Sequence, residues 1–356
     1  MNSLDDVAAM TKLDPMDVHG STAAYADQCE EAWNLSSVIQ FSEDYRAARN
    51  VVVSGMGGSR FTPRSVKELF FDRITVPYEI VDSYVLPYYV RDESVVILSS
   101  YSGTTEETVS CGLEAVTRRA KVTGVAQGGR VQELLQENKF PGYFFSGKYN
   151  PCGQPRIGGG YLLMGHIGLL KALGFLSIND QEVTEAICFA RDYAKKLLAS
   201  VPEHDNQAKQ LARSLKDTHP FLIASEHLRG FVNGFANQIN ETAKMISDFR
   251  YIPELNHHLM EGLKHPDTLH ENGVFVFLDS DLYMPQIRKR FEITKEVVAK
   301  QNVKTLSVKL TGPTKLAQVL EGFTLSSFTT FYMAMLYDLD PVAIPWVDYF
   351  KQQLAK

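Results

Sequence analysis

Two stretches of small and hydroxyl residues directly follow apolar runs, and their residue types suit binding of a phosphate group. In the first, Val95-Val96-Ile97-Leu98 leads into Ser-Ser-Tyr-Ser-Gly-Thr-Thr at 99–105, and a helical pattern follows at once. Such an apolar run predicts a buried parallel strand. A helix N-terminus attracts anions, and the hydroxyls of Ser100, Ser102 and Thr105 add neutral donors. These hydroxyls are more than a helix cap needs, so we expect phosphate here.

The second stretch is Ser-Gly-Met-Gly-Gly-Ser at 54–59, which also follows an apolar strand. It is not a nucleoside triphosphate P-loop, because no Gly-Lys-Ser/Thr follows. Arg60 stands where a dinucleotide-binding turn has its third glycine. An open α/β sheet brings the ends of two such strands together at a crevice. We therefore expect the backbone of Gly57 and Gly58 and the Ser59 hydroxyl to complete the phosphate site.

Three further positions have side chains that could transfer protons or stabilise charge. Arg156 lies between Pro155 and three glycines, where composition alone indicates a surface arginine in a hinge. Glu241 falls late in a predicted helix; a glutamate there is usually solvated, but a buried one has a raised pKa and can act as a base. Adjacent His257 and His258 suggest a metal, yet their spacing fits no zinc motif. A histidine that transfers protons near neutral pH fits better, and we expect no metal.

Alternating strands and helices must position these residues. Five strands are predicted in the first half, and the second half repeats the pattern faintly. The first five are Val51–Ser54, Val76–Val81, Val95–Ser99, Lys121–Ala126 and Tyr143–Phe145; Pro220–Ser225, Val274–Leu278 and Thr305–Val308 follow. Helices are predicted near 64–71, 105–119, 131–136, 161–173, 180–199, 226–246, 284–300 and 313–336. The predicted fold class is α/β, with two doubly wound parallel-sheet (αβα sandwich) subdomains and helical N-terminal and linker segments.

This organisation predicts four regions along the chain. They are an N-terminal helical extension at 1–48, a first subdomain with the expected phosphate site at 49–152, a loop with linker helices at 153–204, and a second subdomain with a C-terminal tail at 205–356.

Composition narrows the class of protein. The chain has 356 residues and a formal charge of −6 from 36 basic and 42 acidic residues, with no basic block that would favour nucleic acid. No apolar run approaches the ~20 residues of a membrane span, and the N-terminus does not resemble a secretion signal. Cys29, Cys111, Cys152 and Cys188 show no metal or paired spacing. We expect four reduced thiols in a cytoplasmic protein.

The order of the motifs is similar to that of a known family. Gly-Met-Gly-Gly-Ser followed by Ser-Tyr-Ser-Gly-Thr-Thr-Glu-Glu-Thr resembles the sugar isomerase (SIS) domain, which binds phosphosugars. Gln154-Pro155-Arg156, Asn240-Glu241-Thr242-Ala243-Lys244 and Glu254-Leu255-Asn256-His257 then resemble the bifunctional phosphoglucose/phosphomannose isomerases. The resemblance extends from about Val51 to Lys351 and implies two SIS-type subdomains.

The resemblance implies an enzyme that interconverts an aldose and a ketose hexose 6-phosphate through a cis-enediolate, without a cofactor. Glu241 corresponds to the catalytic base and Arg156 to the arginine that stabilises the enediolate. His257 corresponds to a ring-opening histidine supplied by the neighbouring subunit of a homodimer. Lys351 matches a lysine in a tail that folds over the active site.

Two departures from the family bear on the expected roles. The family has Asn-His-Asn where this chain has His258 in the third position. The family also has a tail threonine linked to accepting the mannose epimer, but no hydroxyl residue lies between Pro341 and Asp348. Glucose 6-phosphate is therefore a safer substrate expectation than mannose 6-phosphate.

Other functions stay open at this point. A phosphosugar-sensing module without catalysis would need the sugar site, but it would not need the combination of Glu241, Arg156 and Lys351. A nucleotide-dependent oxidoreductase is suggested by the glycine turn and by Asp82 near the end of the second strand. An isomerase of another phosphosugar, such as an amino sugar or a pentose, also fits the motifs.

Overall fold

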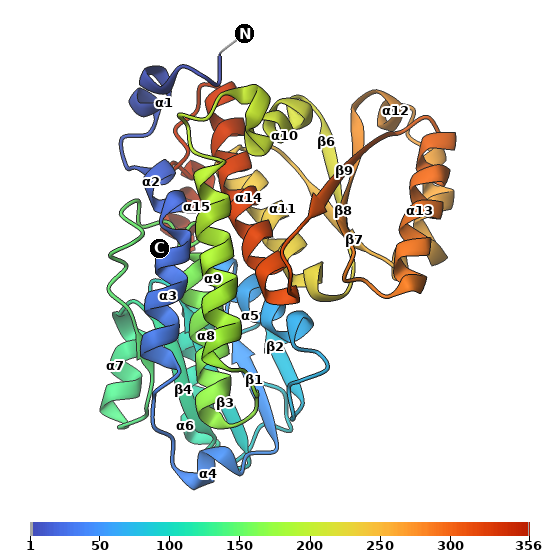
Figure 1. Cartoon of the computed structure of the whole chain (residues 1–356). Helices are drawn as coiled ribbons and strands as arrows, with labels where there is room; N and C mark the ends of the chain where they lie inside the picture. Colours follow the sequence, from blue (N-terminus) through green and yellow to red (C-terminus); the bar gives the residue numbers. More distant parts are fainter. Residues whose placement is uncertain (1–2, 355) are drawn as a thin grey trace.

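The computed structural model describes residues 3–354 and 356, and it contains two parallel β-sheets with helices packed between and around them (Figure 1). The first sheet has the order β2-β1-β3-β4-β5, with all pairs parallel. Its strands are β1 (Asn50–Ser54), β2 (Tyr78–Val81), β3 (Ser94–Ser100), β4 (Lys121–Ala126) and β5 (Tyr143–Phe144). The strand order reverses between β1 and β3, which is where open α/β sheets leave a crevice for ligands.

Successive residues of the first sheet enter two different cores, as the period of a strand requires. Val51 and Val53 join the large core that contains α5 (Gly58–Leu69) and α8 (Gly159–Leu173). Val52 faces the opposite side, in a smaller core with α6 (Glu106–Thr117) and α7 (Gly129–Glu137). Both faces of this sheet are therefore covered, which explains why β3 is buried along its whole length.

The second sheet repeats this topology without β5. Its order is β7-β6-β8-β9, again all parallel. The strands are β6 (His219–Ala224), β7 (Asp248–Tyr251), β8 (Gly273–Ser280) and β9 (Lys304–Leu310), and the helices around them are α10 (Gln207–Leu215), α11 (Arg229–Thr242), α12 (Thr268–Asn272), α13 (Pro285–Lys300) and α14 (Lys315–Leu336). The predicted fold class, with two related parallel sheets, is confirmed.

Long helices join the two halves. In Figure 1, α3 (Tyr25–Ser36) lies beside α8 and α9 (Asp180–Lys195), and α14 packs against α9 and α11. α8 and α14 are buried almost all round. α8 is mainly apolar, whereas α14 also buries polar residues such as Gln318, Glu321 and Ser326. The other elements are α1 (Val7–Leu13), α2 (Val18–Ala23), α4 (Glu43–Arg46), α15 (Pro345–Leu354) and the 3-10 turns η1 (Glu203–Asp205), η2 (Glu226–Leu228), η3 (Glu254–His257) and η4 (Leu259–Lys264).

Several predicted helices have different bounds in the structure. The helix predicted near 64–71 begins at Gly58, and Pro63 lies inside it. The helix predicted over Glu226–Ile246 is wrong at its end, because α11 stops at Thr242 and the edge strand β7 follows. Lys244 takes a left-handed conformation (φ +54°), which breaks the helix.

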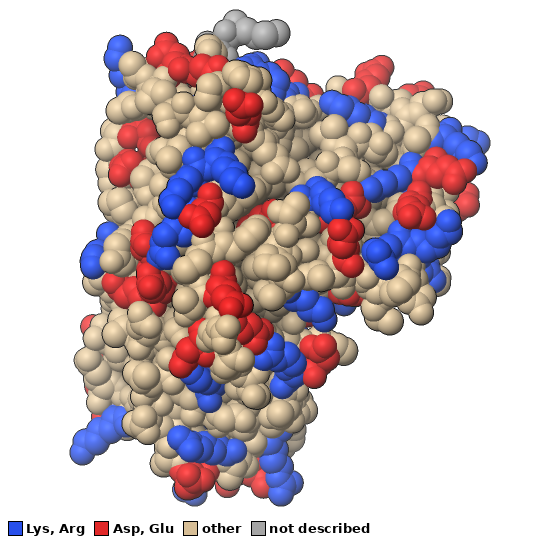
Figure 2. Space-filling view, in the orientation of Figure 1, with Lys and Arg blue, Asp and Glu red and all other residues tan. Residues whose placement is uncertain are grey.

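The described part of the chain contains no helix of the length and hydropathy needed to cross a membrane. On the face shown in Figure 2, Lys and Arg side chains are interspersed with Asp and Glu. This face therefore carries no broad surface of one charge.

Candidate active site

Two helix N-termini without side-chain caps lie at the crevice of the first sheet. Gly57 is the N-cap of α5, with φ +51°, and Thr105 is the N-cap of α6; neither helix start has a side-chain hydrogen bond to its free N–H groups. Because β1 and β3 are parallel neighbours, both helices start at the same edge of the sheet. At the start of α5 the N–H groups of Ser59 and Arg60 donate to the Met56 and Gly57 carbonyls, but the positive dipole ends of both helices still favour an anion at this edge.

The glycine loop (residues 54–59) and the hydroxyl loop (residues 99–105) are joined by Ser59, whose Oγ accepts a hydrogen bond from the Tyr101 N–H at 2.9 Å. Ser100 Oγ accepts from the Gly103 N–H at 3.0 Å and shares a 2.8 Å hydrogen bond with Thr105 Oγ1. Ser59 and Ser100 are buried, whereas Ser102 is exposed and Thr105 is half-buried. The structure thus brings the six predicted residues to one edge of the sheet: Gly57, Gly58, Ser59, Ser100, Ser102 and Thr105. The buried Ser59 and Ser100 organise the two loops.

Gly103 shows why the hydroxyl loop needs a glycine. Its φ is +72°, and a Cβ there would lie 1.7 Å from the Gly128 carbonyl oxygen. Any other residue at 103 would displace the loop from the start of α7.

The loop that carries Arg156 (residues 149–158, the arginine loop) is packed against both of these loops. A Cβ on Gly58 would lie 3.3 Å from the Pro155 carbonyl oxygen. Asn150 Nδ2 donates to the Tyr101 hydroxyl at 2.7 Å and to the Gln154 carbonyl at 3.0 Å. Arg156 is therefore not a surface hinge residue, as the composition of its surroundings suggested, but a buried residue next to the predicted phosphate site.

The Arg156 side chain is only 2 % exposed, and acceptors surround its guanidinium group. Nε donates to Thr242 Oγ1 at 3.0 Å, and Nη1 donates to Gln154 Oε1 at 2.8 Å. Nη2 donates to the carbonyls of Pro341 and Val342 at 2.6 and 3.0 Å. Burial lowers the pKa of Arg156, but its ordinary value is far above neutrality, so the group stays charged.

Glu241 faces this guanidinium from the last turn of α11. Its Oε2 lies 3.5 Å from Arg156 Nη1, and the carboxylate side chain keeps 32 % of its surface exposed. Burial raises the pKa of Glu241, and the positive charges of Arg156, Lys351 and Lys244 oppose that shift. A partly accessible carboxylate with a raised pKa beside a fixed cation has the properties of a general base next to an oxyanion site.

The two remaining predicted residues lie differently. Lys351 is on α15, close enough for its charge to affect the pKa of Glu241. His257 ends η3 and is exposed. Within the described residues, no hydrogen bond or ion pair joins His257 to Glu241, Arg156 or Lys351.

Sequence reasoning missed the residues that hold Arg156 in place. Gln238 Nε2 donates to the Arg156 carbonyl and to Ser327 Oγ, both at 2.9 Å, and Ser326 Oγ donates to Gln238 Oε1 at 2.6 Å. This buried network ties the arginine loop to α11 and α14. No local signal marks Gln238, because its partners lie some 80 to 90 positions away in the sequence.

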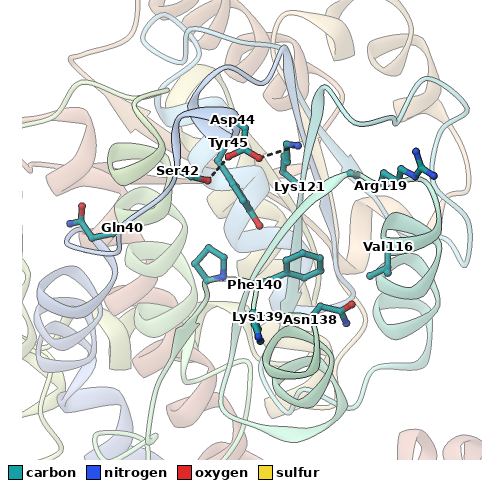
Figure 3. Close-up of a pocket in the computed structure, with 12 residues that line it drawn as sticks. Gln40, Ser42, Asp44, Tyr45, Val116, Arg119, Lys121, Asn138, Lys139 and Phe140 are labelled. Carbon is teal, nitrogen blue, oxygen red and sulfur yellow. Dashed lines mark hydrogen bonds and ion pairs between the residues drawn. The ribbon is translucent and has the colours of Figure 1, made fainter.

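A cavity of about 750 Å³ lies at the opposite edge of the first sheet, by the N-terminal ends of its strands (Figure 3). Tyr45 and Phe140 line it, but Lys121 is paired with Asp44 at 3.1 Å, and Arg119 extends away from the other lining side chains. The cavity holds none of the predicted site residues. No three His, Cys, Asp or Glu side chains of the described residues gather as a group that could hold a metal ion.

Known proteins that are similar to this chain agree with this architecture. Residues 204–354 match the family model of the bacterial phospho-glucose isomerase C-terminal SIS domain. A bifunctional phosphoglucose/phosphomannose isomerase from Caldicellulosiruptor bescii is 28 % identical over 334 residues, covering 93 % of this chain and 96 % of that protein. The resemblance predicted from the motifs is confirmed.

Two further proteins extend the comparison. The bifunctional phosphoglucose/phosphomannose isomerase of Thermoplasma acidophilum is 27 % identical over 329 residues, covering 92 % of this chain and 97 % of that protein. A solved structure of a hypothetical protein from Thermus thermophilus superimposes with a TM-score of 0.74 at 16 % identity, covering 98 % of this chain and 93 % of that one. The fold and the resemblance to bifunctional phosphoglucose/phosphomannose isomerases thus extend over nearly the whole chain.

Proposed function

We propose that this protein is a sugar-phosphate isomerase that interconverts glucose 6-phosphate and fructose 6-phosphate through a cis-enediolate. The observation that carries the proposal is the pair of Glu241 and Arg156. A carboxylate with a raised pKa lies 3.5 Å from a buried, fixed guanidinium, beside two uncapped helix N-termini. Near-full-length relatives that bear the isomerase name support the same reaction.

In this mechanism the phosphate is a handle that positions the reacting carbons. The N–H groups at the starts of α5 and α6, with Ser102 and Thr105, hold the phosphate, while Ser59 and Ser100 keep the two loops in register. Binding energy from this remote group orients C1 and C2 of the sugar at Glu241.

Proton transfer then takes place at Glu241. Its carboxylate removes the proton from C1 of the ketose, and the carboxyl group so formed delivers a proton to C2. The hydroxyl proton of O1 passes to O2, so no net proton is consumed. Negative charge develops on the enediolate oxygens, and the charge of Arg156 stabilises it. At 3.5 Å, the contact of Nη1 with Glu241 is the longest of the five that Arg156 makes, so we expect the developing oxyanion on this side of the guanidinium.

We further propose a homodimer in which His257 of one chain completes the site of the other. Two observations support this arrangement. His257 is exposed, with no hydrogen bond or ion pair to Glu241 among the described residues. In addition, α15 has no buried residue, although it carries Trp346 at 81 % and Phe350 at 61 % exposure. A second chain that covers these apolar side chains would bury surface that a monomer leaves in water.

Mixing two inactive variants tests this arrangement. Glu241→Gln and His257→Gln chains, mixed after dissociation, should regain about a quarter of wild-type turnover, because half of the dimers are mixed and each mixed dimer has one intact site. No recovery, or a monomer by light scattering, would exclude His257 acting in trans.

The four cysteines are all free thiols, which supports our proposal of a cytoplasmic location.

Product analysis tests the proposed function itself. Fructose 6-phosphate is incubated with the protein in EDTA, and glucose 6-phosphate and mannose 6-phosphate are measured separately. Glucose 6-phosphate should form. Mannose 6-phosphate in addition would show that the absent tail hydroxyl does not prevent use of this epimer. Saturable binding without either product would instead support a phosphosugar-sensing module.

A further inference from the structure

Two cations hold three consecutive carbonyl groups just before the C-terminal helix. Lys244 Nζ donates to the Asp340 carbonyl at 2.8 Å. The two tail bonds of Arg156 Nη2 go to the next two carbonyls, those of Pro341 and Val342, at 2.6 and 3.0 Å. We name residues 340–342 the tail segment. All three carbonyls of this segment accept hydrogen bonds from cations whose charges also lower the pKa of Glu241.

The tail segment determines where α15 lies. It connects the end of α14 to α15, and the Val342 N–H closes a turn by donating to Asp340 Oδ1 at 2.8 Å. No residue of α15 is buried within the chain, so within one chain little packing of its own fixes this helix, whatever a second chain of the proposed dimer adds. Lys351 is on α15, and its approach to Glu241 therefore depends on the anchored segment before it.

Lys244 is built for this contact. It follows α11 directly, and its left-handed backbone turns the chain back beside the helix end. Its Nζ also donates to the Thr242 carbonyl at 3.1 Å, one of the free carbonyls at the C-terminus of α11, where a positive charge is favoured. Burial lowers the pKa of Lys244 to about 8, so the ammonium group is still mainly protonated at neutral pH.

We propose that Lys244 is a positioning residue for the isomerisation proposed above: together with Arg156 it anchors the tail segment, so that α15 holds Lys351 at Glu241. Lys244 does not touch the reacting carbons. We assign to Lys351, which matches the family's tail lysine, the role of assisting ring opening of the sugar, and Lys244 acts through it. The inference rests on the proposed function, and the experiment below separates the two.

The test uses Lys244→Met, Lys244→Arg and Lys351→Met, with Lys300→Met as the control. Lys300 forms an exposed ion pair with Glu296 on α13, remote from the tail segment in the sequence. Lys244→Met should lower kcat by about 10–100-fold, because a misplaced group of an active site costs this much, with little change in KM, since both phosphate-binding loops are untouched. Lys244→Arg keeps a charged donor and should restore most of the loss. Lys300→Met should behave as wild type.

Two readouts separate positioning from a general loss of structure. Hydrogen exchange in residues 341–354 should become faster in Lys244→Met while the rest of the chain keeps its protection. In a Lys351→Met background, Lys244→Met should cause no further loss of kcat, because both changes remove the same contribution.

The possible outcomes are distinct. A wild-type protein without isomerase activity would exclude the proposed function. An active wild type with a fully active Lys244→Met variant would overturn the positioning role of Lys244, whatever the exchange shows. Lower kcat with unchanged exchange in 341–354, or with additive losses in the double variant, would also overturn it, because Lys244 would then not act through the tail segment.

Discussion

Replacing Glu241 by glutamine is the sharpest perturbation of the proposed chemistry. The amide has the same shape and keeps an oxygen to accept from Arg156, but it cannot take a proton from C1. A positioned base contributes about 10²–10⁴ in rate, so kcat should fall by this factor, equivalent to about 2.7–5.4 kcal/mol in the barrier. KM should change little, because Glu241 lies outside the loops that hold the phosphate.

The structure also predicts how this variant folds. Burial raises the pKa of Glu241 above its ordinary 4.5, so the ionised carboxylate opposes folding once the pH exceeds that value. Glutamine removes this cost. At pH 7–8 the variant should therefore be at least as stable as wild type in thermal or urea unfolding, which separates lost chemistry from lost structure.

Steady-state turnover of fructose 6-phosphate, coupled to detection of glucose 6-phosphate, measures the effect. Glu241→Asp is the matched control, since it keeps the carboxylate but shortens its reach, and it should lie between wild type and glutamine. Near-normal kcat in a well-folded Glu241→Gln protein would refute the assignment of the base.

Three further predictions follow from particular contacts. Arg156→Lys keeps the charge but cannot bond Thr242, Gln154 and the tail carbonyls together, so kcat should fall about 10²–10³-fold, and an unchanged kcat would show that charge alone suffices. Ser102→Ala removes an exposed hydroxyl and should raise KM with kcat unchanged; a fall in kcat alone would place Ser102 elsewhere in the mechanism. Burial lowers the pKa of His166 from 6.5 to about 3, so this neutral histidine favours folding above pH 6.5 and loses that effect as the pH falls. His166→Gln should remove up to about 2 kcal/mol of the stability difference between pH 7 and pH 5 in urea titrations, and an unchanged difference would contradict it.

The parts that sequence reasoning predicted depend on local patterns. Apolar runs marked β1, β3 and β4 within one residue of their ends, since a strand covered on both faces needs apolar side chains throughout. The glycines and hydroxyl residues after β1 and β3 marked the two loops, because they end these apolar runs. β7 was missed, because each of its residues Asp248–Tyr251 is half-buried at a sheet edge and leaves no such run.

The surroundings of Arg156 could not be predicted, because its acceptors come from distant parts of the chain. Thr242 lies 86 positions away and Pro341 lies 185. Composition suggested a surface arginine, while five hydrogen-bonded contacts in the structure fix it in the interior. For the same reason the contact of Lys244 with the Asp340 carbonyl could not be predicted, because Asp340 lies 96 positions later in the chain.

The most direct test of the account follows the proton itself. Fructose 6-phosphate is converted in D₂O, and the glucose 6-phosphate formed is examined by NMR at C2. Transfer by the Glu241 carboxylate through an enediolate predicts deuterium at C2, because the carboxyl proton exchanges with solvent during turnover. Glucose 6-phosphate that forms at the normal rate without any deuterium at C2 would contradict the account, since the hydrogen would then have moved directly between the two carbons.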